Sequence, residues 1–119
     1  MITVIFDKDQ NGDITALFMS GHAGYDEAGY DIICSAASTL FYTAIDALNE
    51  VCGLSDTSVI NEDDGSGDVS GRVVIPKDTD SETFKKAQIV MQTIKAGFTS
   101  LAFSANQGDE QYIELIESK

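Results

Sequence analysis

Two long segments of this chain carry apolar residues at three- and four-residue steps, and this spacing predicts two amphipathic helices. The first runs from Cys34 to about Val51, with Gly53 as its expected C-cap. Its apolar positions are Ala37, Leu40, Phe41, Ala44, Ile45, Leu48 and Val51. The second starts at Thr79-Asp80-Ser81-Glu82, which has capping-box spacing. Its apolar positions are Phe84, Ala87, Met91, Ile94, Phe98 and Leu101.

Short stretches rich in β-branched and aromatic residues surround these helices. They lie near 2–6, 14–20, 57–61, 69–75 and 111–116, and Asn11-Gly12 between the first two is a hairpin signal. The predicted order is therefore β-β-α-β-β-α-β. We expect an α+β two-layer sandwich with a mostly antiparallel sheet and both helices on one face. The length of 119 residues suits a single domain covering residues 1–119.

The segment that starts at Asp7 matches the first eight positions of a calcium-binding EF-hand loop. The twelfth position of such a loop needs a bidentate Glu, but Phe18 occupies it here. The motif also needs a flanking helix on each side, and both flanks have strand patterns. We interpret these acidic residues as hairpin-turn residues, and we expect neither a metal nor a cofactor.

The charge balance restricts the partners of the chain. Twenty acidic residues against seven basic ones give a net charge of −13. Nucleic-acid binding needs the opposite charge, so we expect no direct contact with nucleic acid. The charge favours a basic partner, or serves only solubility. The N-terminus lacks the pattern of a signal peptide, and no apolar run approaches the roughly 20 residues needed to cross a bilayer, so we expect a cytoplasmic protein with no membrane contact.

Cys34 and His22 are the candidate nucleophile and base. Residues 21–33 contain three glycines and no sustained period, so we expect a loop there, with His22 at a strand end and Cys34 in the first helical turn. Backbone N–H groups at a helix start would stabilise a thiolate and the oxyanion of an attacked carbonyl. The alternatives are a small buried Cys and a surface His. Cys52, at the end of an apolar stripe, is expected to be structural, and one His with two distant Cys is too few for zinc.

The stretch from Gly21 to Ser38 resembles the ribosomal-processing cysteine protease family, known as Prp. The family signature is a Gly-His pair, a glycine-containing loop and an Asp-Ile-aliphatic-Cys segment that runs into small residues and Ser. Here these parts are Gly21-His22, the loop through Gly24 and Gly29, and Asp31-Ile32-Ile33-Cys34 followed by Ala36, Ala37 and Ser38. Ser35 stands where many members carry Ala. The length and the element order are also similar to those of the family.

The resemblance implies a homodimeric endopeptidase. It would remove a short N-terminal extension from the twenty-seventh protein of the large ribosomal subunit, a basic partner, and would aid ribosome maturation. His22 is then the general base and Cys34 the nucleophile, and residues 23–33 would form a lid over the peptide. The expected substrate-binding residues are Gly21, Gly24, Tyr25, Asp26, Gly29, Asp31 and Ser38.

Several roles stay open at this stage. Asp31 would either orient the imidazole or cap the helix, and capping is slightly favoured because Asp is a good N-cap residue. A non-catalytic ribosome-associated binding module is one alternative function. A thiol redox sensor is another, although Cys52 lies four to five helical turns from Cys34, which is too far for a resolving thiol.

Overall fold

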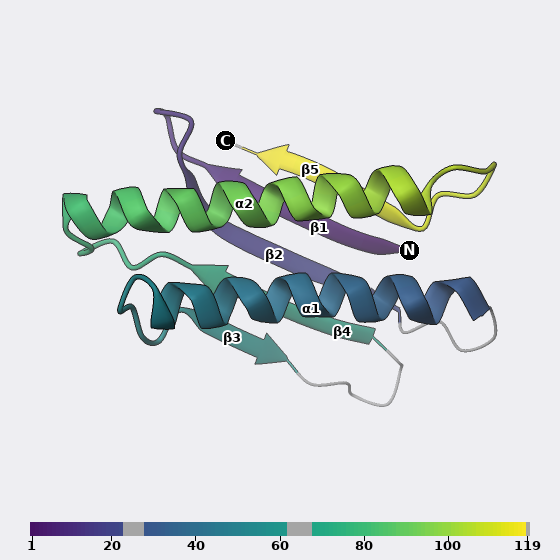
Figure 1. Ribbon diagram of the computed structural model, residues 1–119, viewed down its shortest axis with the longest axis horizontal. Coiled ribbons are helices and arrows are strands. Elements are labelled where there is room, and N and C mark those ends of the chain that lie inside the picture. The colour runs from purple at the N-terminus through teal and green to yellow at the C-terminus, as the bar shows by residue number, and fades with distance from the viewer. Residues whose placement is uncertain (23–27, 62–67, 119) are drawn as a thin grey trace.

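The described residues form seven elements in the predicted order (Figure 1). The computed structural model describes residues 1–22, 28–61 and 68–118. The elements are β1 (Ile2–Lys8), β2 (Ile14–His22), α1 (Ala28–Glu50), β3 (Ser58–Asn61), β4 (Asp68–Val74), α2 (Ser81–Ala105) and β5 (Ile113–Ser118). The expectation of an α+β fold with this element order is confirmed.

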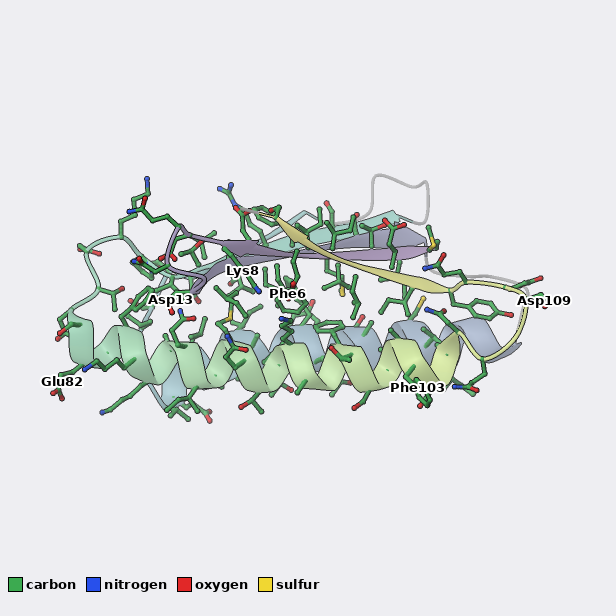
Figure 2. All side chains as sticks on the ribbon, turned by 90° about the horizontal axis from the view of Figure 1, so that it is seen from above. Phe6, Lys8, Asp13, Glu82, Phe103 and Asp109 are labelled. Carbon is green, nitrogen blue, oxygen red and sulfur yellow. The ribbon has the colours of Figure 1, made fainter. Side chains whose placement is uncertain are left out.

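The strands form one sheet in the order β3-β4-β2-β1-β5. Neighbouring strands are antiparallel except β1 and β5, which run parallel. Both helices lie on one face, α2 over the β1–β5 side and α1 over the β3–β4 side (Figure 1). Viewed from above, the described elements form two layers, with Phe6 between them and Phe103 pointing away from the sheet (Figure 2).

The Asp9–Asp13 segment is a hairpin turn, as its sequence predicts. The Asp9 carboxylate accepts hydrogen bonds from the N–H groups of Asn11, at 2.8 Å, and Asp13, at 3.0 Å. Gly12 has a φ of 83°, a conformation that most other residues rarely adopt. Strands flank the turn on both sides, which contradicts the calcium-loop interpretation. In the part of the chain that the structure describes, no group of three His, Cys, Asp or Glu residues could hold a metal ion.

The core lies between the two layers. Val4 and Phe6 of β1 alternate with half-buried neighbours, as expected of a strand with one buried face. Phe6 meets Phe98 of α2 edge to face, with ring centroids 5.9 Å apart. Residues Ile32–Glu50 of α1 are long and apolar enough to cross a membrane by length and composition. In this fold, however, the apolar stripe of α1 packs into the core through Ala37, Phe41, Ala44 and Leu48.

The two helices pack closely against each other at Gly97. A Cβ atom built there would lie 2.6 Å from Leu40 Cδ2, so the missing side chain lets α1 and α2 approach. The predicted C-cap of α1 is confirmed, since Gly53 has a φ of 70° and its N–H donates to the Asn49 carbonyl at 2.9 Å.

One predicted helix cap and one predicted helix start are wrong. The N-cap of α2 is Asp80, whose carboxylate accepts from the Thr83 N–H at 2.8 Å, so the proposed capping box at Thr79 does not form. Helix α1 begins at Ala28, six residues before Cys34. The glycines predicted a loop in this segment, but local propensity is a weak guide that tertiary context can override. Ile33, within the added part of the helix, packs against the core.

Candidate active site

Cys34 is the seventh residue of α1 and faces the sheet. It precedes the buried residues Ala37 and Phe41 by three and seven positions, so all three share one side of the helix. Its side chain is half-buried and packs against the core cluster. The thiol is therefore held by well-packed surroundings and retains partial access to solvent.

The position of Cys34 corrects the sequence-based account of its activation. Only the first four N–H groups of an α-helix lack a partner within the helix, and the effect of the dipole is largest in the first turn. The seventh residue of α1 lies beyond these groups. The start of α1 therefore does not place free N–H groups at Cys34, and the oxyanion hole and thiolate stabilisation expected from it are wrong.

His22 is the last residue of β2 and pairs with Asp68 of β4. The preceding residue, Gly21, lies tightly against the N-terminus of the chain. A Cβ atom at Gly21 would lie 2.8 Å from the Ile2 Cα and 2.9 Å from the Met1 carbonyl oxygen. These neighbours are backbone atoms that cannot swing aside, so only glycine fits here. The Gly-His pair therefore has a packing reason: Gly21 lets the end of β2 lie against the start of β1.

The two halves of the motif lie at one end of the molecule. Residues 23–27 join the end of β2 to the start of α1, and five residues limit the gap between them to about 20 Å. Along α1, Cys34 follows Ala28 by six residues, a rise of about 9 Å. Figure 1 shows the start of α1 at the end of the sheet where β2 finishes. The backbone thus places His22 and Cys34 toward the same end of the molecule, in different layers.

The other predicted site residues fall into two groups. Ser38 is half-buried one helical turn after Cys34, and Gly29 and Asp31 are the second and fourth residues of α1. Asp31 therefore lies inside the helix, and the capping role favoured for it is wrong. Residues 28–33 of the expected lid belong to α1 and are helical. Gly24, Tyr25 and Asp26 lie outside the described residues.

Cys52 lies beyond the opposite end of α1. Its separation of 18 residues from Cys34 corresponds to about 27 Å along a helix, too far for a disulfide. Burial raises the pKa of the Cys52 thiol, and the nearby Lys86 opposes this only in part. A raised pKa keeps the sulfur in its less nucleophilic form. These observations support the expected structural role of Cys52.

Comparison with known proteins assigns the family. The family model described as "Cysteine protease Prp" matches residues 1–113. The chain belongs to the Prp family of cysteine proteases. A Prp from Staphylococcus aureus, the ribosomal processing cysteine protease, is 32% identical over 108 residues, which cover 90% of this chain and 93% of that protein. The protein is therefore a cysteine protease of the ribosomal-processing type, and the predicted resemblance is confirmed.

Two solved Prp structures share the fold. Prp from S. aureus with a substrate peptide superposes with a TM-score of 0.69 at 27% identity, covering 99% of this chain and all of that one. The same protease with a covalently linked product peptide gives a TM-score of 0.67 at 28% identity, over the same shares of both chains. Prp membership thus makes the enzyme interpretation correct and leaves the non-catalytic binding module without support.

Proposed function

We propose that this Prp protease removes a short N-terminal extension from the twenty-seventh protein of the large ribosomal subunit, in the cytoplasm and as a homodimer. Cys34 is the nucleophile and His22 the base. The family assignment carries the proposal, because a cysteine protease needs a thiol, and the only other thiol, Cys52, has a raised pKa and lies far from the motif. The net charge of −13 favours a basic substrate and disfavours nucleic acid.

Because Cys34 lies in the second turn of α1, activation of its thiol depends on the His22 imidazole rather than on the helix N-terminus. Since the helix start does not supply the positive potential, a base must take the thiol proton or an imidazolium must pair with the thiolate. His22 is the only histidine in the chain. Asp31 follows it in the motif and remains the candidate for orienting the ring.

The reaction proceeds in two steps. The Cys34 sulfur attacks the scissile carbonyl carbon while His22 accepts the thiol proton, and His22 then gives that proton to the leaving amine as the C–N bond breaks. Water next attacks the acyl-enzyme with His22 as base, which releases the carboxylic acid and restores the thiol. The covalently linked product peptide in the S. aureus protease supports a covalent route of this kind.

The test is mass spectrometry of the extended ribosomal protein after incubation with the enzyme. Wild type and Cys52→Ala should release the same N-terminal fragment, whereas Cys34→Ala and His22→Ala should release none. Circular dichroism confirms that each variant is folded. Cleavage by Cys34→Ala would overturn the assignment of the nucleophile, and the absence of cleavage by folded wild type would overturn that of the substrate.

A further inference from the structure

The sheet face opposite the helices carries a row of small hydroxyl residues beside a row of large side chains. Val4 and Phe6 face the core, so the residues that alternate with them on β1 face away from the helices (Figure 2). In the pairing registers, the hydroxyl row crosses β1, β2 and β4 as Thr3, Ser20 and Ser70. The row of large side chains crosses the same strands as Ile5, Phe18 and Arg72.

A hollow of about 450 Å³ lies where these two rows meet. Residues of both rows line it, so its surface combines hydroxyl groups, the apolar side chains of Ile5 and Phe18, and the Arg72 guanidinium. Small-molecule sites usually measure about 300–1,000 Å³ and combine apolar side chains with a few polar groups that orient the ligand. The hollow therefore has both the size and the mixed chemistry of such a site.

Arg72 is the only basic residue among the described residues that line the hollow, and none of them is acidic. Arg72 is exposed and has no ion-pair partner in the part of the chain that the structure describes, although the chain carries twenty acidic residues. A guanidinium binds a carboxylate through two parallel N–H···O bonds. The charge of the hollow therefore favours an anionic ligand.

The surroundings of Arg72 favour a monoanion with an apolar body. One guanidinium balances one negative charge, and the net charge of −13 repels a dianion such as hydrogen phosphate more strongly than a monoanion. Ile5 and Phe18 provide apolar surface that an organic ligand can cover, with a gain in hydrophobic free energy. A bare inorganic anion does not make that gain.

We propose that this hollow binds a small aromatic carboxylate. The carboxylate pairs with the Arg72 guanidinium, and the ring packs on Phe18 and Ile5. The hydroxyl groups of Thr3 and Ser20 line the polar side of the hollow, where they can donate to the ligand. This binding site goes beyond the proposed function, because it requires neither Cys34 nor a peptide.

The test is a titration with phenylacetate, followed through the backbone amide chemical shifts of the protein. Wild type should bind with a dissociation constant of about 1 mM or tighter, as expected for a ligand of about ten non-hydrogen atoms. The largest shifts should fall on the segments of β1, β2 and β4 that line the hollow. Two comparison compounds separate the contributions: 2-phenylethanol lacks the charge, and inorganic phosphate lacks the apolar body. Each should bind about tenfold more weakly or worse.

Three variants locate the site. Arg72→Gln removes the charge but keeps a polar side chain, and it should weaken phenylacetate binding about tenfold or more. Ser20→Phe places a ring at an exposed position in the hollow, and it should block binding with Arg72 still present. Lys85→Gln removes an exposed cation from α2 and is the matched control, which should bind as wild type does. Thermal melts check that each variant is folded.

The proposal fails if wild type shows no saturable binding, or if the shifts lie away from the hollow. Equal affinity of Arg72→Gln and wild type, or equal affinity for phenylacetate and 2-phenylethanol, would refute the role of Arg72. Phosphate that binds as tightly as phenylacetate would refute the role of the apolar surface. The titration involves no peptide cleavage, so a negative result leaves the proposed protease reaction standing.

Discussion

The side-chain amide of Gln88 in α2 holds both backbone polar groups of Ile14 at the start of β2. Gln88 Oε1 accepts the Ile14 N–H at 2.8 Å, and Gln88 Nε2 donates to the Ile14 carbonyl, also at 2.8 Å. Ile14 is fully buried, so these backbone groups have little access to water. One glutamine thereby joins the helical layer to the first residue of the strand that ends at His22.

Replacing Gln88 by Ala should therefore cost stability. It leaves a buried N–H and a buried carbonyl without their partner, a loss of about 1–3 kcal/mol. Urea unfolding of Gln88→Ala and of wild type measures the difference. Gln92→Ala is the matched control, because Gln92 is exposed on the same helix. Equal losses for both variants would contradict the role given to the Gln88 amide.

Gly21→Ala should reduce both stability and cleavage. The added methyl group meets the backbone of Met1 and Ile2 at less than 3.0 Å, so β1 and β2 must separate at their ends and His22 must shift. We expect a loss of roughly 1–3 kcal/mol, with a larger fall in the cleavage rate than in the folded fraction. Gly108→Ala provides the control, since a Cβ atom there meets nothing within 4 Å. Wild-type cleavage by Gly21→Ala would refute the positioning argument.

Stability should depend on the ionisation of Glu117. Hydrogen bonds from Lys95 and Lys8, the latter at 3.2 Å, lower the pKa of the Glu117 carboxyl below its ordinary value of 4.5. A lowered pKa in the folded state adds stability that is present above the ordinary value and is lost as the pH falls through the folded value. The contribution is small, because the pair is exposed and screened by salt.

Thermal melts of wild type and Glu117→Gln test this dependence. The melting temperature of wild type should be the higher near neutral pH, and the difference should disappear as the pH falls below the lowered pKa. Added salt should also reduce this difference in melting temperature, because it screens the exposed ion pair. A difference that stays constant from neutral to acidic pH would show that the ion pair is not its cause.

Cys52 should be slow to alkylate. Because burial raises the pKa of its thiol, less thiolate is present at neutral pH than for an unperturbed cysteine. Peptide mapping after timed treatment with iodoacetamide gives the rate, with glutathione in the same solution as the reference thiol. Cys52 reacting faster than glutathione would contradict the raised pKa.

The types and order of the secondary-structure elements follow from local patterns in the sequence, and so does the protease family. The two helices are predicted by apolar residues at three- and four-residue steps, and the strands by stretches rich in β-branched and aromatic residues. The first hairpin is predicted by Asn11-Gly12. All three signals depend only on residues that are close in the sequence. The motif through Gly21, His22 and Cys34 likewise identifies the protease family, which the comparisons confirm. The catalytic roles of His22 and Cys34 stay predictions that the cleavage experiment tests.

Other features required the tertiary structure, because they depend on contacts between residues far apart in the chain. Helix α1 starts at Ala28, before the segment with the regular apolar spacing, and Ile33 in this added part packs on the core. This start moves Cys34 from the first helical turn to the second. The contact of Gly21 with Met1 and Ile2 depends on the pairing of β1 with β2. Arg72, Phe18, Ile5 and Ile116 come to lie side by side only because β4, β2, β1 and β5 are neighbours in the sheet. The order of the strands depends on how all seven described elements pack together, with both helices on one face of the sheet. No single segment of the sequence therefore predicts it.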